Sequence, residues 1–364
     1  MSEQITVLRG DGIDEEIRTA AIRVLDESGD FTYPEAPIGG RAMDECGGDP
    51  FPPETEALAR DSRVVLLGAV GGPKWDSTDP KAPRPEDGLL ALRQAMGTHA
   101  NLRPVYSIST LPDASPYRPE RIEGTDFLIV RELLGGSYYG DKGRSPNGDR
   151  AHDTREYSTQ QIEAVGRTSF ELALARAEES GGDPRVTSVD KANVLETSRL
   201  WRETITALQK AEYPDVALEH MLVDNANFQI GHDPRQFDVM VTENEFGDIL
   251  SDGAANVMGA LGMAPSASLN AEGAGIFEPV HGSAPDIAGK GTANPAAIIL
   301  SAAMALRYTL GRPQEANRVE WAVKRTFRHG VLTADLAPTG RPAASTDEFT
   351  ESVLRFMQGY SARV

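Results

Sequence analysis

The spacing of hydrophobic residues predicts short buried strands that alternate with amphipathic helices. Six runs rich in apolar residues predict strands: 4–8, 64–70, 126–133, 185–191, 217–224 and 237–243. Apolar residues recur at helical spacing in three longer stretches: 15–27, 158–180 and 193–213. Strands and helices that alternate in this way predict an α/β fold, with sheets flanked by helices.

Three other stretches break this pattern. Residues 139–156 are polar and turn-rich, which predicts a surface arm, and residues 81–88 predict a proline-rich loop. Residues 277–295 contain too much glycine and proline for a helix or a strand. The length of 364 residues predicts two lobes or one large α/β unit, because a single simple core seldom grows so large.

The composition excludes several classes of protein. A net charge of −19 argues against nucleic-acid binding, which needs a basic surface. The single cysteine, Cys46, cannot form an internal disulfide, which fits a reducing compartment. No apolar run approaches the roughly 20 residues that span a bilayer, and the first residues lack a signal-peptide pattern. We therefore expect a cytoplasmic protein with no nucleic-acid and no membrane partner.

The common nucleotide and zinc motifs are missing. No G-x-G-x-x-G follows the first strand and no G-x-x-x-x-G-K-[ST] occurs, so any dinucleotide site is not of the Rossmann kind. Neither H-E-x-x-H nor C-x-x-C is present, which argues against a zinc site.

Charged residues near the predicted strands offer two kinds of ligand. Arg93, Arg103 and Arg131 would suit a small di- or tricarboxylate if they converged, because arginine binds carboxylates through two hydrogen bonds. Taken singly, each is better explained as a surface or ion-pair arginine. Asp248 and Asp252 lie four residues apart in the string FGDILSD, on one face of a predicted helix.

These two carboxylates, with Asp224 at the end of a predicted strand, would suit a hard divalent cation such as Mg²⁺ or Mn²⁺. The alternative is a purely structural pair, since acids in a first helical turn are favourable without a metal. Tyr138 and Lys191 are candidate acid–base groups, although the residues alone favour a packed tyrosine and a solvated lysine. Residues 277–295 suit either an adenosine pocket or a structured connector.

Ten short strings, taken in order, resemble the β-decarboxylating dehydrogenases, the family of isocitrate and 3-isopropylmalate dehydrogenases. They are GDGI (10–13), GGPKWD (71–76), RPEDGLLALR (84–93), NLRP (101–104), VRELLGGSYYG (130–140), DKANVLETSRLWRE (190–203), VDNANFQI (223–230), FGDILSD (246–252), GMAPSASL (262–269) and FEPVHGSAPDIAGKGTANP (277–295). The resemblance runs nearly end to end. It implies a two-domain isopropylmalate-dehydrogenase-like fold with a non-Rossmann NAD site and a cleft between the domains.

The first domain would comprise residues 1–100 and 259–364 and bind NAD. The second, 101–258, would carry the dimer interface, the substrate and metal groups, and an arm at about 139–156.

The resemblance also assigns roles to individual residues. Arg93, Arg103 and Arg131 would hold the malate carboxylates. Asp248 and Asp252, with Asp224 of the partner subunit, would bind Mg²⁺ or Mn²⁺, and Asp224 would also face the substrate. Lys191 of the partner subunit would be the general base on the C2 hydroxyl, and Tyr138 would protonate the enol after CO₂ leaves. This division of the site implies a homodimer.

Cofactor and substrate preferences follow from the same resemblance. The implied cofactor residues are Glu278, His281, Gly282, Ser283, Ala284, Asp286, Ile287 and Asn294. NADP enzymes of the family carry basic or tyrosyl residues where this chain has Asp286 and Ile287, so NAD⁺ is expected.

The implied substrate residues are Glu86, Leu89 and Leu90, with Val194 opposite. Leucines would form a slot for an isopropyl group and leave a third carboxylate unpaired. The expected reaction is NAD-dependent oxidative decarboxylation of (2R,3S)-3-isopropylmalate to 4-methyl-2-oxopentanoate and CO₂, in leucine biosynthesis. The alternatives are a sibling enzyme acting on isocitrate, homoisocitrate or tartrate, and a non-catalytic regulatory subunit. The chain departs from the family pattern at Asp14, usually glycine, and at Glu245, usually apolar.

Overall fold

The chain divides into two compact α/β units. The structure, a computed structural model, describes residues 3–79, 82–108, 111 and 114–360. Unit 1 consists of Met1–Gly97, Thr110–Ser115 and Met258–Val364, and unit 2 of Thr98–Ser109 and Pro116–Val257. The predicted α/β fold class is confirmed.

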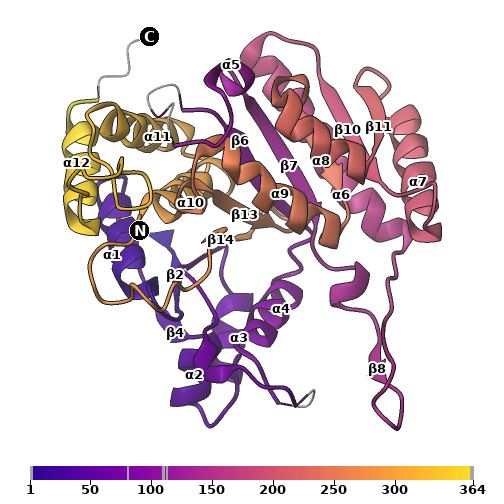
Figure 1. Ribbon diagram of the computed structural model, residues 1–364, viewed down its shortest axis with the longest axis horizontal. Helices are drawn as coiled ribbons and strands as arrows, with labels where there is room; N and C mark the ends of the chain where they lie inside the picture. Colours follow the sequence, from indigo (N-terminus) through magenta and orange to yellow (C-terminus); the bar gives the residue numbers. More distant parts are fainter. Residues whose placement is uncertain (1–2, 80–81, 109–110, 112–113, 361–364) are drawn as a thin grey trace. The chain divides into compact units, whose positions relative to one another are not determined.

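Unit 1 has five strands of a twisted sheet in the order β13-β14-β5-β2-β4 (Figure 1). β13 runs antiparallel to β14, and the other neighbours are parallel. Its strands are β1 (Glu3–Gln4), β2 (Thr6–Arg9), β3 (Phe31–Thr32), β4 (Glu35–Pro37), β5 (Val64–Leu67), β13 (Pro265–Leu269) and β14 (Gly275–Pro279). Its helices are α1 (Asp14–Asp26), α2 (Gly39–Glu45), α3 (Pro53–Arg60), α4 (Pro85–Met96), α10 (Ala296–Tyr308), α11 (Pro313–Arg328) and α12 (Thr346–Gln358), with 3₁₀ turns η1 (Pro73–Trp75) and η4 (Leu261–Met263).

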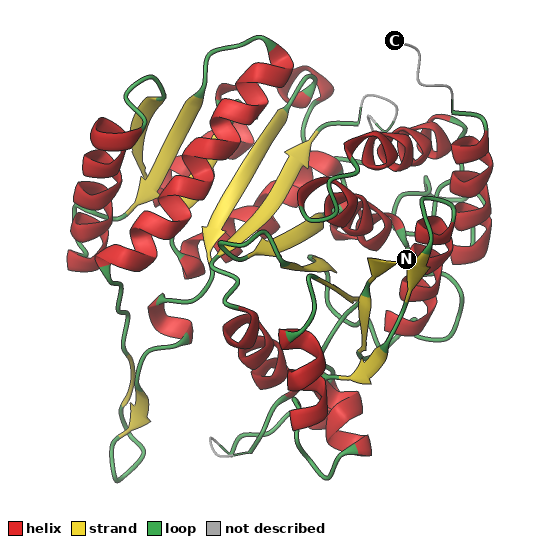
Figure 2. Ribbon diagram, turned by 180° about the vertical axis from the view of Figure 1, so that it is seen from behind, coloured by secondary structure: helices red, strands yellow, loops and turns green. Residues whose placement is uncertain are grey.

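Unit 2 has five strands in the order β11-β10-β12-β7-β6, with α8 and α9 on one face and α6 and α7 on the other (Figures 1 and 2). Only β6 and β7 are antiparallel among these neighbours. The strands are β6 (Ala100–Tyr106), β7 (Asp126–Glu132), β10 (Arg185–Asp190), β11 (Ala217–Leu222) and β12 (Val239–Thr242). The helices are α5 (Pro119–Ile122), α6 (Thr159–Ser180), α7 (Glu196–Glu212), α8 (Val223–His232) and α9 (Asn244–Met258), with 3₁₀ turns η2 (Gly136–Tyr138) and η3 (Pro234–Gln236).

A hairpin of β8 (Lys142–Arg144) and β9 (Ala151–Asp153) extends away from the rest of unit 2 (Figure 1). It falls within the predicted arm at 139–156, and its residues are mostly exposed.

The predicted strands and helices are present, but three boundaries differ. The strand predicted at 217–224 ends at Leu222, and Asp224 lies in the first turn of α8, where an acid is favoured by the helix dipole. β14 includes the first residues of the segment 277–295, because antiparallel β13 and parallel β5 bond to it from both sides. The loop predicted at 81–88 is interrupted by α4, which begins at Pro85 because proline suits the first helical position.

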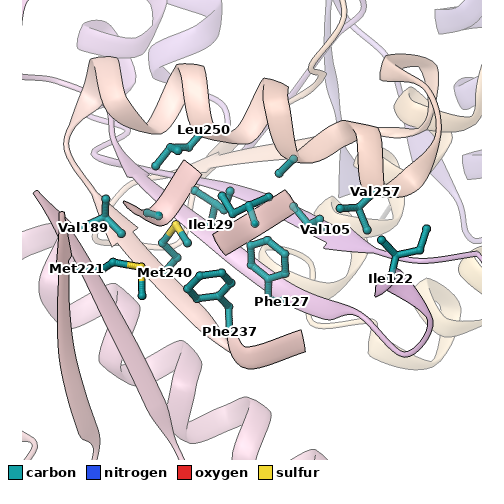
Figure 3. Packing of buried hydrophobic residues seen from close by; sticks show 13 residues of the cluster. Val105, Ile122, Phe127, Ile129, Val189, Met221, Phe237, Met240, Leu250 and Val257 are labelled. Carbon is teal, nitrogen blue, oxygen red and sulfur yellow. The ribbon is translucent and has the colours of Figure 1, made fainter. Parts of the chain in front are cut away.

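The core of unit 2 determines which face of α9 points outward. Leu250, Ala254 and Val257 of α9 pack on Phe127 and other apolar residues of the sheet (Figure 3). At about 100° per residue, these buried positions leave the side of the helix that carries Asp248 and Asp252 pointing away from the core.

Asp14, one of the two departures from the family pattern expected from the sequence, is buried at the start of α1. Its carboxylate accepts hydrogen bonds from the Gly68 backbone N–H at 3.0 Å and from Arg18 Nε at 3.0 Å. A Cβ atom on Gly68 would lie 2.2 Å from Asp14 Oδ1, so the carboxylate fills the space beside that glycine. Burial raises the pKa of Asp14, and Arg18 opposes the rise.

Among the described residues, no helix is long and apolar enough to cross a membrane.

Candidate active site

Two arginines and a tyrosine of unit 2 surround the paired acids of α9. Arg103 donates from Nη1 to Asp252 Oδ1 at 2.7 Å and from Nη2 to Asp248 Oδ1 at 3.4 Å. Arg131 Nη1 donates to Asp248 Oδ1, and Tyr138 Oη donates to Asp248 Oδ2 at 2.7 Å. The guanidinium groups therefore offset the repulsion between two carboxylates one helical turn apart.

Arg131 is held from behind by a side chain that sequence reasoning missed. It is the last residue but one of β7, is only 1 % exposed, and donates from Nε (3.0 Å) and Nη2 (2.7 Å) to Asn244 Oδ1. Asn244 is the first residue of α9 and donates from Nδ2 to the Gly135 carbonyl at 3.0 Å. The two hydrogen bonds to Asn244 fix the Arg131 guanidinium so that its Nη1 points to Asp248.

Arg103 is held in the same way on the neighbouring strand β6. Its Nε donates to Asn101 Oδ1 at 2.8 Å, and its Nη1 also donates to Ser251 Oγ at 2.7 Å. Asn101 begins the string NLRP and Ser251 lies within FGDILSD, but sequence reasoning gave neither a role, and Asn244 lies outside the ten strings. Both arginines are thus oriented before any ligand binds, which lowers the entropy cost of binding a carboxylate.

Protonation of the site follows from burial and from these charges. Partial burial raises the pKa of Tyr138 to about 12, and the hydrogen bond to Asp248 adds to the rise while Arg131 opposes it. The phenol therefore keeps its proton near neutral pH. Burial also raises the pKa of Asp252, with Asp248 adding to the rise and Arg103 opposing it.

Lys191 and Asp224 form a separate pair in unit 2. Lys191 Nζ donates to Asp224 Oδ1 at 2.7 Å, and this hydrogen bond lowers the pKa of Asp224. Val194 follows on the same turn and is 61 % exposed. Among the described residues of one chain, no group of three or more His, Cys, Asp or Glu side chains could hold a metal, so Asp224 does not join the acids of α9 within one chain.

The remaining predicted substrate residues belong to unit 1. Arg93 on α4 is buried and donates from Nη2 to Glu278 Oε1 at 3.0 Å, which links a predicted substrate group to a predicted cofactor group. Glu86 is exposed on the first turn of α4, and Leu89 and Leu90 are half-buried one turn further on.

The predicted cofactor segment of unit 1 is a tight, hydrogen-bonded loop. The Ser283 carbonyl accepts from the Ile13 N–H at 2.9 Å, and Ala284 is the only described non-glycine residue with a left-handed φ, at 38°. Asn294 Nδ2 donates to Asp335 Oδ2 at 3.0 Å, and Asp286 is exposed.

His281 of that loop has a buried ring nitrogen, Nε2, with no hydrogen-bond partner in the described protein, while Nδ1 lies 2.9 Å from the Gly282 carbonyl oxygen. Burial lowers the pKa of His281, so the imidazole is neutral. Gly282 and Ile287 flank these groups in the same loop.

The site holds two acids against buried arginines and a protonated tyrosine. This arrangement is typical of a class of α/β proteins that bind a cation and a small polycarboxylic acid. The family described as "Isocitrate/isopropylmalate dehydrogenase" matches residues 4–353. The 3-isopropylmalate dehydrogenase of Geobacillus kaustophilus is 52 % identical over 99 % of this chain and 96 % of that protein. The 3-isopropylmalate dehydrogenase of Bacillus subtilis is 50 % identical over 97 % of this chain and 96 % of that protein.

The crystal structure of isocitrate dehydrogenase from Methylococcus capsulatus superposes with a TM-score of 0.85 at 32 % identity, covering 98 % of this chain and 99 % of that one. The chain belongs to the isocitrate/isopropylmalate dehydrogenase family, which confirms the family predicted from the sequence.

Glu132, beside Arg131, is a buried carboxyl that sequence reasoning missed. It is fully buried, and burial raises its pKa to about 7. The Leu134 and Gly135 N–H groups, which donate to it at 2.8 and 2.9 Å, oppose the rise, as does Arg131, whereas Glu243 adds to it.

We expect Glu132 to make stability depend on pH. Its native pKa lies above the value of about 4.3 in an unfolded chain, so its contribution is fully present below about pH 4 and is lost as pH rises through 7. Glu132→Gln cannot titrate and should lose less stability than the parent between pH 5 and pH 8, by up to roughly 3 kcal/mol. Urea unfolding at pH 5 and pH 8 measures the free energy of unfolding of Glu132→Gln and the parent. Glu179→Gln, at an exposed position of α6, serves as the control. Equal losses in Glu132→Gln and the parent would contradict the assignment.

Proposed function

We propose that this chain is an NAD-dependent 3-isopropylmalate dehydrogenase acting in leucine biosynthesis. The supporting observation is the arrangement of Arg103, Arg131 and Tyr138 around Asp248 and Asp252, in a chain whose relatives carry that name. A non-catalytic regulatory subunit would have no need of these groups, so their retention favours an enzyme.

The residues of unit 2 fit the proposed chemistry. Arg103 and Arg131 would bind the malate carboxylates through N–H groups that already point at carboxylate oxygens. Lys191 of the partner subunit would take the proton from the C2 hydroxyl, and Tyr138 would give a proton to carbon after CO₂ leaves. The protonated phenol held beside Asp248 is consistent with that second role.

The oxygen ligands of α9 fit a hard divalent cation. Asp248 and Asp252 are partly exposed and are carboxylates, the ligand type that Mg²⁺ and Mn²⁺ prefer. With Asp224 of the partner subunit they would hold the ion, which when bound would stabilise negative charge developing on the C2 oxygen.

The loop around His281 fits a dinucleotide that accepts the hydride from C2. It offers a buried ring nitrogen without a partner and an exposed carboxylate at Asp286, which would bond a ribose 2′-hydroxyl and repel a 2′-phosphate. NAD⁺ is therefore the proposed cofactor, with Glu278, Gly282, Ser283, Ala284, Ile287 and Asn294 completing the proposed set.

A homodimer is the proposed assembly. Val194, Phe228 and Ile249 are more than 60 % exposed on unit 2, which is unusual for large apolar side chains and fits coverage by a second copy. Among the described residues Asp224 bonds Lys191 and forms no metal-binding group with the α9 acids of its own chain, which supports a site that takes Lys191 and Asp224 from the partner subunit. The arm at 139–156 is the proposed place of strand exchange between subunits.

We expect the enzyme to prefer 3-isopropylmalate over isocitrate, homoisocitrate and tartrate, measured as kcat/KM for each acid with NAD⁺. Leu90→Ser should reduce the preference over isocitrate about tenfold or more, since losing apolar contacts costs roughly 1–3 kcal/mol. Leu174→Ser, an exposed change on α6, serves as the control. A parent enzyme that prefers isocitrate would overturn the proposed substrate.

Asp248→Asn should remove the proposed cation site and lower stability, because buried Arg131 loses its charge partner, although the asparagine oxygen can still accept from Arg131 Nη1 and the chain should still fold. We expect kcat to fall at least 100-fold, on the order seen when a charge-stabilising group is lost. Thermal unfolding should then no longer shift upward on adding Mn²⁺, as it should for the parent. Full activity of the parent in excess chelator would contradict a metal role.

Mixing two inactive variants tests whether the site is shared. Lys191→Met and Asp248→Asn should each be inactive as homodimers. A mixed dimer would have one site with both changes and one site with neither. After random re-pairing, half of the dimers are mixed and each of these has one intact site. Activity should therefore recover to about a quarter of that of the parent. No recovery, with mixed dimers shown by native mass spectrometry, would place both residues in one subunit's site.

A further inference from the structure

The last residues of the arm lie alongside the junction of β12 and α9. Arg155 Nη2 donates to Glu245 Oε2, and Arg155 Nη1 lies 3.7 Å from Glu243 Oε1. The Arg155 guanidinium also lies 4.7 Å from the ring centroid of Phe246, a cation–π contact. Glu245 is one of the two positions where the chain departs from the family pattern, and the structure gives its charge a dedicated partner.

Glu245 also reaches the turn that carries Tyr138. Ser137 Oγ donates to Glu245 Oε2 at 3.3 Å, and Ser137 immediately precedes Tyr138 in η2. The same carboxylate oxygen therefore joins the end of the arm, through Arg155, to the turn. We call Arg155, Glu245 and Ser137 the arm clasp.

Tyr157 closes the turn from behind. Its Oη donates to Glu243 Oε2 at 2.8 Å and accepts from the Asn244 N–H at 3.0 Å. Its ring leaves no room for a side chain on the turn: a Cβ on Gly136, which has a φ of 75°, would lie 2.4 Å from Tyr157 Oη. Main-chain bonding adds a further tie, because the Gly136 N–H donates to the Glu156 carbonyl at 3.0 Å.

Tyr157 and Gly136 thus fix the buried side of η2. The outer side of η2 depends on a single carboxylate, that of Glu245. The side chains of Arg155 and Glu245 are 21 % and 36 % exposed, so water competes for the outer tie. Tyr138 has its hydroxyl 2.7 Å from Asp248, and a small shift of η2 would move it away.

We propose that the arm clasp is a positioning device that holds the Tyr138 hydroxyl in place and so couples the base of the arm to the protonation step. In the described contacts the clasp residues touch neither Asp248 and Asp252 nor Arg103 and Arg131. They act through Tyr138, so they are positioning residues and not catalytic ones. The proposal rests on the role of Tyr138 in the proposed function.

Glu245→Leu tests the clasp by replacing the carboxylate with an apolar side chain. We expect kcat with 3-isopropylmalate to fall about tenfold, and KM to change less than about twofold, because misplacing a reacting group by a fraction of an ångström slows chemistry more than binding. The double variant Arg155→Leu/Glu245→Leu removes both members of the Arg155–Glu245 pair, while Glu243 keeps its hydrogen bond from Tyr157, and it should show the same loss. Circular dichroism and thermal unfolding confirm that each variant folds.

A Tyr138→Phe background separates positioning from a general structural effect. With no phenol to misplace, Glu245→Leu should lower the residual kcat by less than about twofold, so the two changes are strongly non-additive. An equal fold-loss in both backgrounds would overturn the proposal, as would an unchanged kcat in Glu245→Leu.

The control is Arg167→Leu, which breaks another partly exposed ion pair of unit 2, with Glu212, far along the chain from the turn. Its kcat should stay within about 1.5-fold of that of the parent, because surface ion pairs contribute little to stability.

Tyr138→Phe alone tests the proposed function. An undiminished kcat in Tyr138→Phe would refute the role of Tyr138. A reduced kcat in Tyr138→Phe together with an unchanged kcat in Glu245→Leu would refute only the arm clasp.

Discussion

The buried guanidinium of Arg131 is the constraint on which the site of unit 2 depends. A cation that is 1 % exposed is costly unless every N–H finds a partner and its charge is balanced. Asn244 satisfies one side of the fork and Asp248 supplies the opposite charge. Both partners lie on α9, so the start of that helix must lie against the end of β7.

The two sides of α9 carry different kinds of stabilisation. Its apolar side packs on the sheet through Leu250, Ala254 and Val257, which fixes the rotation of the helix. That rotation presents Asp248 and Asp252 to Arg103 and Arg131, so the cost of placing two like charges one turn apart is offset by residues from two strands. Core packing therefore decides where the charges of the site lie.

The sequence alone predicted the elements and most of the charged groups because both depend on local pattern. Helical spacing located α6, α7 and the acids of α9, and apolar runs located the buried strands. Asn244, Tyr157 and Glu132 escaped notice because their roles come from contacts with residues distant in the chain, as when Tyr157 reaches Glu243. The misplaced Asp224 is a boundary error, since a strand passes into α8 without any turn residue between them. The family resemblance supplied the roles, which no spacing contains.

The buried carboxylate of Asp14 bears on how this sequence can change over time. Gly68 lies so close to Asp14 Oδ1 that any side chain there would meet the carboxylate, and Arg18 would keep only Glu35 as a carboxylate partner if Asp14 were replaced by glycine. A side chain at position 68 therefore requires a change at Asp14, and the effect of changing Asp14 depends on Arg18. The three positions are coupled, so the effect of a substitution at one of them depends on which residues already stand at the other two.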